Sequence, residues 1–245
     1  MLRTGEIAPA LAFAGSVSMR GHELFPPVNI HVPAGRWTCL LGASGVGKTT
    51  LLKLIAGLEA TARHDGTITA SDALPLTGRI ALMAQSDLLM PWLSAIDNVL
   101  LGARLRGEKA DRARARDVLA RVGLSAHEDK RSDTLSGGER QRVALARTLM
   151  EDRAVVLLDE PFSALDARTR AEMQSLAARL LAGRTVLMVT HDPGEAVRMG
   201  DQVLLLTAQG CSAIELPDSP PPRAVDDEGA LKAQGALLSR LMALT

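Results

Sequence analysis

Residues 42–49 constrain what this chain can fold into more than any other segment. They read Gly-Ala-Ser-Gly-Val-Gly-Lys-Thr and satisfy the pattern G-x-x-x-x-G-K-[ST]. An apolar run at 37–41 precedes them, and residues 48–57 have the apolar spacing of a helix. Glycines let the backbone wrap closely around a phosphate, and the amides at a helix start bind its charge. The segment therefore predicts a phosphate-binding loop between a strand and a helix, with an ordinary strand-to-helix turn as the alternative.

Each position of this loop is a candidate contact to a nucleoside triphosphate. The amine of Lys48 is expected to reach the β- and γ-phosphates, and the hydroxyl of Thr49 is expected to bind Mg²⁺. The other candidates are Gly42, Ala43, Ser44, Gly45, Val46, Gly47 and Thr50.

An acidic pair follows the apolar residues 155–158. The pair is Asp159 and Glu160, and a parallel strand presents its last residues at the ligand-binding edge of a sheet. Asp159 suits the outer coordination of Mg²⁺, and Glu160 could orient or deprotonate an attacking water. An acidic pair at a strand end usually marks a turn, but together with the phosphate loop it indicates a nucleoside triphosphatase.

Strand-like and helix-like segments alternate along most of the chain, which favours a mostly parallel sheet covered on both faces. Strands are expected at 37–41, 66–70, 79–84, 154–158, 184–189 and 201–206, after short strands in the first 41 residues. Helices are expected at 48–57, 94–106, 111–122, 138–150, 167–181 and 229–243.

Composition adds a few limits. The 245 residues fit one large domain, and the formal net charge of zero gives no indication of a polyanion-binding protein. Cys39 and Cys211 form no disulfide framework and lack metal-ligand spacing. No apolar stretch approaches the ~18 residues that are needed to span a bilayer.

Residues 135–142, Leu-Ser-Gly-Gly-Glu-Arg-Gln-Arg, resemble the signature sequence of ABC-type ATPases. Further segments match that family in the expected order: Gln85 of the Q-loop, the acidic pair, residues 163–166 of the D-loop, and His191. The resemblance covers residues 10–215. It implies an α/β fold of the P-loop NTPase (RecA-like) class, with a mostly parallel sheet core, an antiparallel β N-terminal part and an inserted α-helical signature subdomain.

The resemblance also divides the chain. An ATP-binding domain is expected at 1–216, with its core at 1–85 and 152–216 and its helical insert at 86–151. A Pro-rich break at 217–222 begins a C-terminal tail, 217–245, whose role the sequence leaves open.

The family further implies a composite site. Two copies are expected to pair head to tail as a homodimer and to bury ATP and Mg²⁺ between the phosphate loop of one and the signature of the other. The signature residues begin a helix and would offer N–H groups to the γ-phosphate; they are Ser136, Gly137 and Gly138. The implied catalytic residues are Glu160, His191 and Gln85, and the implied metal-binding residues are Thr49, Gln85 and Asp159. The structural alternatives are helix N-caps at Ser136 and Asp166.

One departure from the family concerns the adenine base. Members usually carry an aromatic residue, commonly Tyr, upstream of the phosphate-loop lysine, whereas this chain contains no Tyr. The corresponding region offers Met19, Arg20, His22 or Phe25 to cover the base, and the sequence does not decide among them.

Residues 88–99, LLMPWLSAIDNV, resemble the same loop in ATPases of importers for nitrate, taurine, sulfonates and thiamine-precursor pyrimidines. The resemblance implies that the loop receives a helix of an integral membrane permease, with a solute-binding protein as an indirect partner and no nucleic acid. The chain would then lie peripherally on the cytoplasmic face of the inner (plasma) membrane. The alternative is that the apolar side chains pack within the helical lobe; they are Leu88, Leu89, Met90 and Trp92.

Other functions stay open beside the main prediction of an ATP-hydrolysing importer subunit. ABC ATPases that act on chromosomes carry a long coiled coil between the two Walker motifs, and those that act in translation usually carry two cassettes. This chain has one cassette and 110 residues between Lys48 and Asp159. A scaffold ATPase of iron–sulfur assembly would be equally short, and the transported solute is not encoded in this chain.

Overall fold

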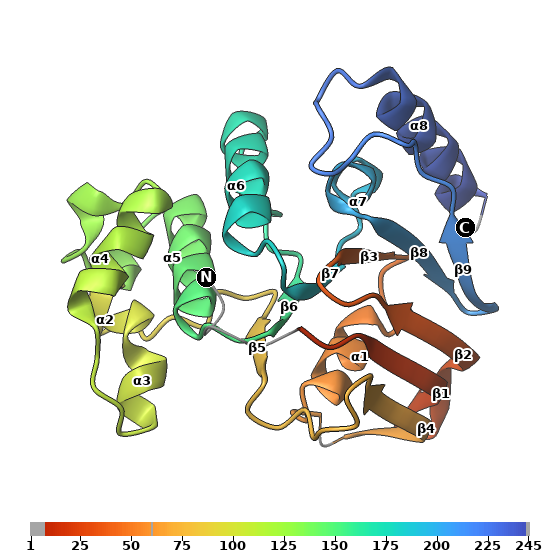
Figure 1. Ribbon diagram of the computed structural model, residues 1–245, viewed down its shortest axis with the longest axis horizontal. Coiled ribbons are helices and arrows are strands. Elements are labelled where there is room, and N and C mark those ends of the chain that lie inside the picture. Colours follow the sequence, from red (N-terminus) through yellow and green to blue (C-terminus); the bar gives the residue numbers. More distant parts are fainter. Residues whose placement is uncertain (1–7, 60, 244–245) are drawn as a thin grey trace.

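A computed structural model describes residues 8–59 and 61–243, so residues 1–7 of the predicted domain lie outside the described part. The larger of its two sheets has the strand order β5-β6-β7-β3-β8-β9 (Figure 1). These strands are β5 (Ile80–Met83), β6 (Val155–Asp159), β7 (Thr185–Val189), β3 (Trp37–Leu41), β8 (Gln202–Thr207) and β9 (Gly210–Ile214). Neighbours from β5 to β8 pair in parallel, and β9 pairs antiparallel with β8. The predicted mostly parallel sheet is confirmed.

The smaller sheet is antiparallel, as expected for the N-terminal part. Its order is β2-β1-β4, from β1 (Leu11–Met19), β2 (His22–Val32) and β4 (Ala62–Ala70). These strands are longer than the short ones predicted, and β1 pairs with β2 on one side and with β4 on the other along almost its whole length.

Helix α1 (Lys48–Ile55) lies between the two sheets and gives the phosphate loop its rigid support (Figure 1). Leu51 and Leu52 are fully buried in one apolar cluster with residues from both sheets, including Phe13 and Leu157. Side chains alternate across a strand, so the neighbours of Leu157 in β6 face the opposite layer.

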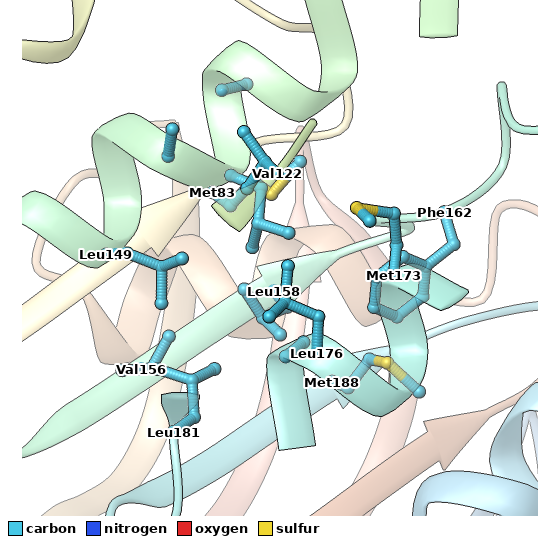
Figure 2. Close-up of a cluster of buried hydrophobic side chains, with 14 of the residues drawn as sticks. Met83, Val122, Leu149, Val156, Leu158, Phe162, Met173, Leu176, Leu181 and Met188 are labelled. Carbon is cyan, nitrogen blue, oxygen red and sulfur yellow. The ribbon is translucent and has the colours of Figure 1, made fainter. Parts of the chain in front are cut away.

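That opposite layer contains α5 (Gly137–Met150) and α6 (Ala167–Leu180). Figure 2 shows Val156 and Leu158 of β6 packing with Leu149 and Leu176 of these helices. The carboxyl end of β6 is thereby held from both faces, and the acidic pair lies at this end.

Between β5 and β6 the chain forms a helical lobe (Figure 1). It consists of α2 (Ala95–Val99), α3 (Leu101–Leu105), α4 (Arg112–Arg121) and the start of α5. The sequence predicts one helix at 94–106, and this is wrong in detail, since the buried Leu100 separates two short helices. The boundary of the lobe at 86–151 stays a prediction.

Two elements near the C-terminus were not predicted, namely β9 and α7 (Pro193–Met199). Helix α7 has Asp192 as its N-cap and Pro193 in its first turn, a strong start signal that a short seven-residue helix makes easy to overlook. The predicted terminal helix is present as α8 (Glu228–Met242) and packs against α7. Within the described residues, no helix combines the length and the apolarity that crossing a bilayer requires.

Candidate functional site

The phosphate loop runs from the end of β3 to the start of α1, and Lys48 is the first residue of that helix. The Lys48 amine donates hydrogen bonds to the carbonyl oxygens of Gly42 (2.7 Å) and Ala43 (2.8 Å). Burial lowers the pKa of Lys48, while the charges of Glu160 and Asp159 oppose that shift. The loop therefore holds a buried amine close to two carboxylates and beside its own backbone.

Two glycines of the loop are required by the space around them. A Cβ at Gly42 would lie 2.3 Å from the carbonyl oxygen of Leu206, so only glycine allows this approach to β8. Gly47 starts α1 with a φ of 102°, and its Cβ would lie 3.1 Å from the ring of Phe25. The pattern thus reflects close backbone contacts and a left-handed residue at the helix start.

Thr49 and Asp159 meet at the end of β6. The Thr49 hydroxyl donates to Asp159 Oδ1 at 3.1 Å, and Asp159 is almost fully buried. Burial raises the pKa of Asp159 and the charge of Glu160 adds to this rise, while the hydrogen bond from Thr49 opposes it. A hydroxyl and a carboxylate are hard oxygen donors of the kind that Mg²⁺ prefers. Among residues 8–59 and 61–243, no group of three or more His, Cys, Asp or Glu side chains is arranged to hold a metal ion.

The Glu160 carboxylate is held from two sides. His191 Nδ1 lies 3.1 Å from its Oε1, and the Gln85 amide donates to its Oε2 at 3.3 Å. Glu160 adopts a φ of 48°, unusual for a residue other than glycine, and its N–H donates to the carbonyl of Val189 in β7. The structure therefore brings the three predicted catalytic residues together just beyond the ends of β5, β6 and β7.

One cavity joins the phosphate loop to this carboxylate. Its lining residues are Met19, Leu24, Ser44, Gly45, Gly47, Lys48, Thr49, Thr50, Gln85 and Glu160. The predicted contacts Gly42, Ala43 and Val46 belong to the same loop but are not part of the lining. An anion bound here would meet loop amides, the Lys48 amine and the Glu160–Gln85 pair.

The signature residues do not line this cavity. Ser136 caps α5 by accepting a hydrogen bond from the Glu139 amide at 3.2 Å, and Glu139 accepts one in return from the Ser136 amide at 2.7 Å. Ser136 and Gly137 are exposed, and Gly138 is half-buried. The structural alternative of an N-cap is therefore correct, and the same geometry leaves a helix N-terminus open to solvent. Asp166 likewise caps α6, through the Thr169 amide.

The residues considered for covering the adenine base differ clearly in their exposure and position. Phe25 is buried and packs edge-on against Phe13, with 6.2 Å between the ring centroids, so its ring is not available. Arg20 and His22 are exposed beside the β1–β2 turn, and Met19 lines the cavity. Leu24, which sequence reasoning missed, lines the same cavity as Met19 and directly precedes Phe25 in β2.

The apolar loop after Gln85 is divided between the core and the surface. Leu89 is buried, whereas Leu88 is 57% exposed and Trp92 is 66% exposed. The packing alternative is therefore correct for Leu89, whereas Leu88 and Trp92 face outward, and the contact with a permease helix stays a prediction. Leu88 also lines a groove of about 460 Å³ with residues that include Leu58, Leu76, Leu82, Leu101 and Leu105.

The chain resembles known proteins over nearly its full length. Residues 25–163 match the ABC transporter family. An uncharacterized ABC transporter ATP-binding protein of Haemophilus influenzae is 42% identical over 92% of this chain and 95% of its own length. The aliphatic sulfonates import ATP-binding protein SsuB of Escherichia coli K12 is 42% identical over 98% of this chain and 93% of its own.

Among solved structures, an ATP-binding cassette in a dimeric post-hydrolysis state with ADP and Pi aligns with a TM-score of 0.71. It is 27% identical, and the alignment covers 87% of this chain and 99% of that cassette. The glycine-rich loop with its lysine, the acidic strand end and these relatives agree, and the chain belongs to the ABC transporter family as one of its ATP-binding, ATP-hydrolysing proteins.

Proposed function

We propose that two copies of this chain pair head to tail and hydrolyse ATP at two shared sites. The observation that carries this proposal is the separation of two anion-binding features within one chain. Lys48 shares a cavity with Glu160, whereas residues 136–138 begin α5 on a surface outside that cavity. A pairing of two copies about a two-fold axis would place the phosphate loop of each copy against residues 136–138 of the other. The solved relative described above is itself dimeric.

The proposed chemistry follows from the positions of the side chains. Lys48 and the loop amides hold the β- and γ-phosphates, and the hydroxyl of the partner subunit's Ser136 and the amide of the partner's Gly137 donate to the γ-phosphate. Thr49, Asp159 and Gln85 would hold Mg²⁺, which supplies positive charge to the phosphate oxygens. Glu160 accepts the proton of the water that attacks the γ-phosphorus, and the bond to the ADP oxygen breaks.

The two neighbours of the Glu160 carboxylate have separate roles in this proposal. Gln85 fixes Oε2 from the side of β5, and His191 fixes Oε1 from the side of β7. A carboxylate held from two sides keeps one orientation toward the attacking water, which reduces the entropy lost at the transition state.

We further propose that the dimer drives an importer through a separate membrane permease. The groove lined by Leu58, Leu88 and Leu105 suits the apolar face of a short helix, and all three side chains are more than half exposed. The relatives named as import proteins support this partner. They give no support to iron–sulfur assembly or nucleic-acid processing. The chain would then lie on the cytoplasmic face of the inner membrane, with a solute-binding protein as an indirect partner.

Gly137→Asp tests the shared site. A Cβ at Gly137 meets no atom closer than the Arg140 guanidinium at 3.9 Å, and an acidic residue suits the first turn of α5. The variant should therefore fold and bind ATP in its own phosphate loop with unchanged affinity. Its added charge faces the triphosphate of the partner subunit, so ATP turnover should fall at least about tenfold, corresponding to about 1.4 kcal/mol of lost transition-state stabilisation.

Ser125→Asp is the matched control, since Ser125 is exposed in a short turn of the same lobe. It should keep both ATP affinity and turnover. If Gly137→Asp weakens ATP binding to the single subunit, or leaves turnover intact, the shared site is wrong.

A further inference from the structure

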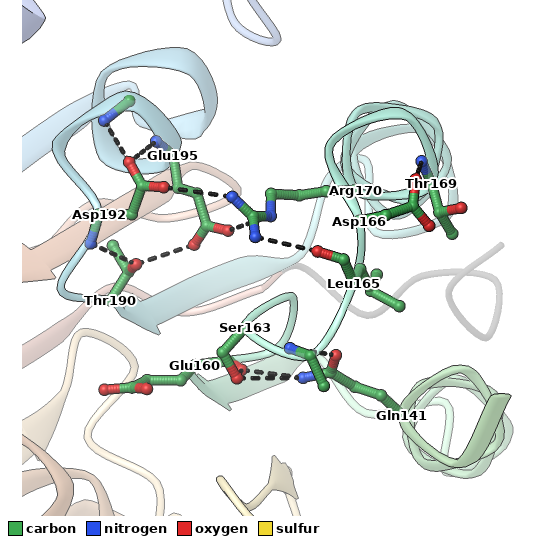
Figure 3. Close-up of polar contacts among 12 residues, drawn as sticks. Gln141, Glu160, Ser163, Leu165, Asp166, Thr169, Arg170, Thr190, Asp192 and Glu195 are labelled. Carbon is green, nitrogen blue, oxygen red and sulfur yellow. Dashed lines mark hydrogen bonds and ion pairs between the residues drawn. The ribbon is translucent and has the colours of Figure 1, made fainter. Parts of the chain in front are cut away.

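Arg170 on α6 contacts one backbone carbonyl and two carboxylates, which belong to the loop before α6 and to the start of α7 (Figure 3). Its Nη2 donates to the carbonyl oxygen of Leu165 at 3.0 Å, in the loop before α6. Its Nη1 lies 3.5 Å from Asp192 Oδ2, and its Nε lies 3.6 Å from Glu195 Oε1. One guanidinium therefore joins the loop after β6 to the start of α7.

The second of these loops carries His191, and hydrogen bonds fix the residues on both sides of it. The Thr190 hydroxyl donates to Glu195 Oε2 at 2.8 Å, and the Asp192 amide donates to the Thr190 hydroxyl at 3.0 Å. Asp192 also accepts hydrogen bonds from the amides of Gly194 (2.7 Å) and Glu195 (3.3 Å). The backbone at His191 is thus held between Thr190, whose partner Glu195 faces Arg170, and Asp192, whose own carboxylate faces Arg170.

Charge makes Arg170 important for this arrangement. Glu195 is 5% exposed, and burial raises its pKa. The charge of Asp192 adds to this rise, while the hydrogen bond from Thr190 and the charges of Arg170 and His191 oppose it. Without the guanidinium, two neighbouring carboxylates would face each other at the start of α7, one of them buried. Such a pair relaxes by moving apart, by taking up a proton, or by admitting water. Each of these changes alters the loop that carries His191.

The first loop is linked in turn to the signature helix. Gln141 of α5 donates to the Glu160 carbonyl at 3.1 Å and accepts a hydrogen bond from the Ala164 amide at 3.0 Å. Leu165 lies 3.3 Å from the position of a Cβ on Gly138. In Figure 3 the Glu160 side chain points away from Gln141, so Gln141 holds the backbone of Glu160 and not its carboxylate.

We propose that Arg170 is a positioning residue that holds His191 against Glu160 and ties this position to the loop at Leu165 and Asp166. The inference rests on the proposed function, because it assigns Arg170 a role through His191 in ATP hydrolysis. A shift of the signature helix in the paired state would pass through Leu165 and Arg170 to His191. The guanidinium fits this task because its planar fork serves several acceptors at once.

The test is a double-mutant cycle of Arg170→Ala with His191→Ala, measured by ATP turnover and by nucleotide binding. Arg170→Ala alone should lower kcat at least about tenfold, with KM and ATP affinity within about twofold of wild type. In the His191→Ala background, the same substitution should change kcat less than about twofold, because the group it positions is gone. If Arg170 merely stabilised the fold, the two substitutions would lower kcat independently, and the loss in the double variant would be the product of the two single losses.

Arg168→Ala is the matched control, since Arg168 is on the same helix and its side chain is 89% exposed. It should leave kcat unchanged. Should Arg170→Ala fail to fold, Arg170→Lys carries the same cycle, since an ammonium keeps the charge but cannot span three acceptors, and its kcat should fall at least about threefold. Unchanged kcat in the Arg170 variants, or effects that multiply with His191→Ala, overturns the inference. Wild-type turnover that depends on Glu160 would leave the proposed function intact in either case.

Discussion

His191 Nδ1 lies 3.1 Å from Glu160 Oε1, and the register of two parallel strands produces this contact. Asp159 of β6 pairs beside Val189 of β7, so the next residues of both strands emerge from the same edge of the sheet. The Glu160 amide then bonds to the carbonyl of Val189, which fixes the distance between the two loops. His191 thereby contacts the carboxylate of Glu160, although the two residues are 31 positions apart in sequence.

The first prediction concerns Glu160→Gln. The amide keeps the size of the side chain and its contact with Gln85, but it cannot take a proton from water. Turnover should fall by about 10²-fold or more, and the variant should accumulate as an ATP-bound dimer in size-exclusion chromatography with Mg²⁺. Glu172→Gln, on the exposed side of α6, is the control and should match wild type. A turnover rate that stays near wild type removes Glu160 from the catalytic role.

The second prediction concerns Lys48→Ala. Loss of charge-assisted hydrogen bonds to phosphate should weaken ATP binding by about 1.5–3 kcal/mol, or about 10- to 160-fold in Kd, measured by titration calorimetry. Lys53→Ala is the matched control, because Lys53 is exposed on the same helix. Equal affinities in the two variants would contradict the assignment of Lys48 to the phosphates.

The sequence predicts those parts of the site that depend on local patterns. The phosphate loop, the acidic strand end and the helix cap at Ser136 each combine a short motif with one strand or helix, and the parallel sheet places their ends together. The contacts of Arg170 with Asp192 and Glu195 could not be predicted. They join two helices whose packing depends on the whole core, and α7 itself was missed. Leu24 was missed because an irregular pairing between β1 and β2 changes which residues face the cavity.

The third prediction concerns Leu88→Asn in the groove assigned to the permease. Leu88 has a φ of 47° and is mostly exposed, and asparagine tolerates this left-handed conformation better than leucine. The variant should therefore fold and keep its basal ATP turnover, while transport by the assembled importer in proteoliposomes should fall. Leu238→Asn, on the partly exposed face of α8, serves as control and should transport normally. Normal transport with Leu88→Asn would count against the groove as the docking site.

The fourth prediction concerns the dependence of stability on pH at Asp152. Burial opposes ionisation of Asp152, but hydrogen bonding and charge from Arg184, together with the charge of Arg114, hold the pKa of this carboxyl below its ordinary value. A lowered pKa in the folded state stabilises the protein at pH values above the ordinary pKa of Asp, about 3.9, and this contribution is lost as the pH falls below that value.

Asp152→Asn should therefore lower the free energy of unfolding in urea by about 1–3 kcal/mol at pH 7, because the buried Arg184 loses its charged partner. The difference from wild type should narrow as the pH falls below about 4. Asp117→Asn, exposed on α4, should differ from wild type by less than about 0.5 kcal/mol throughout, and an equally small effect of Asp152→Asn at pH 7 would show that the pair does not stabilise the fold.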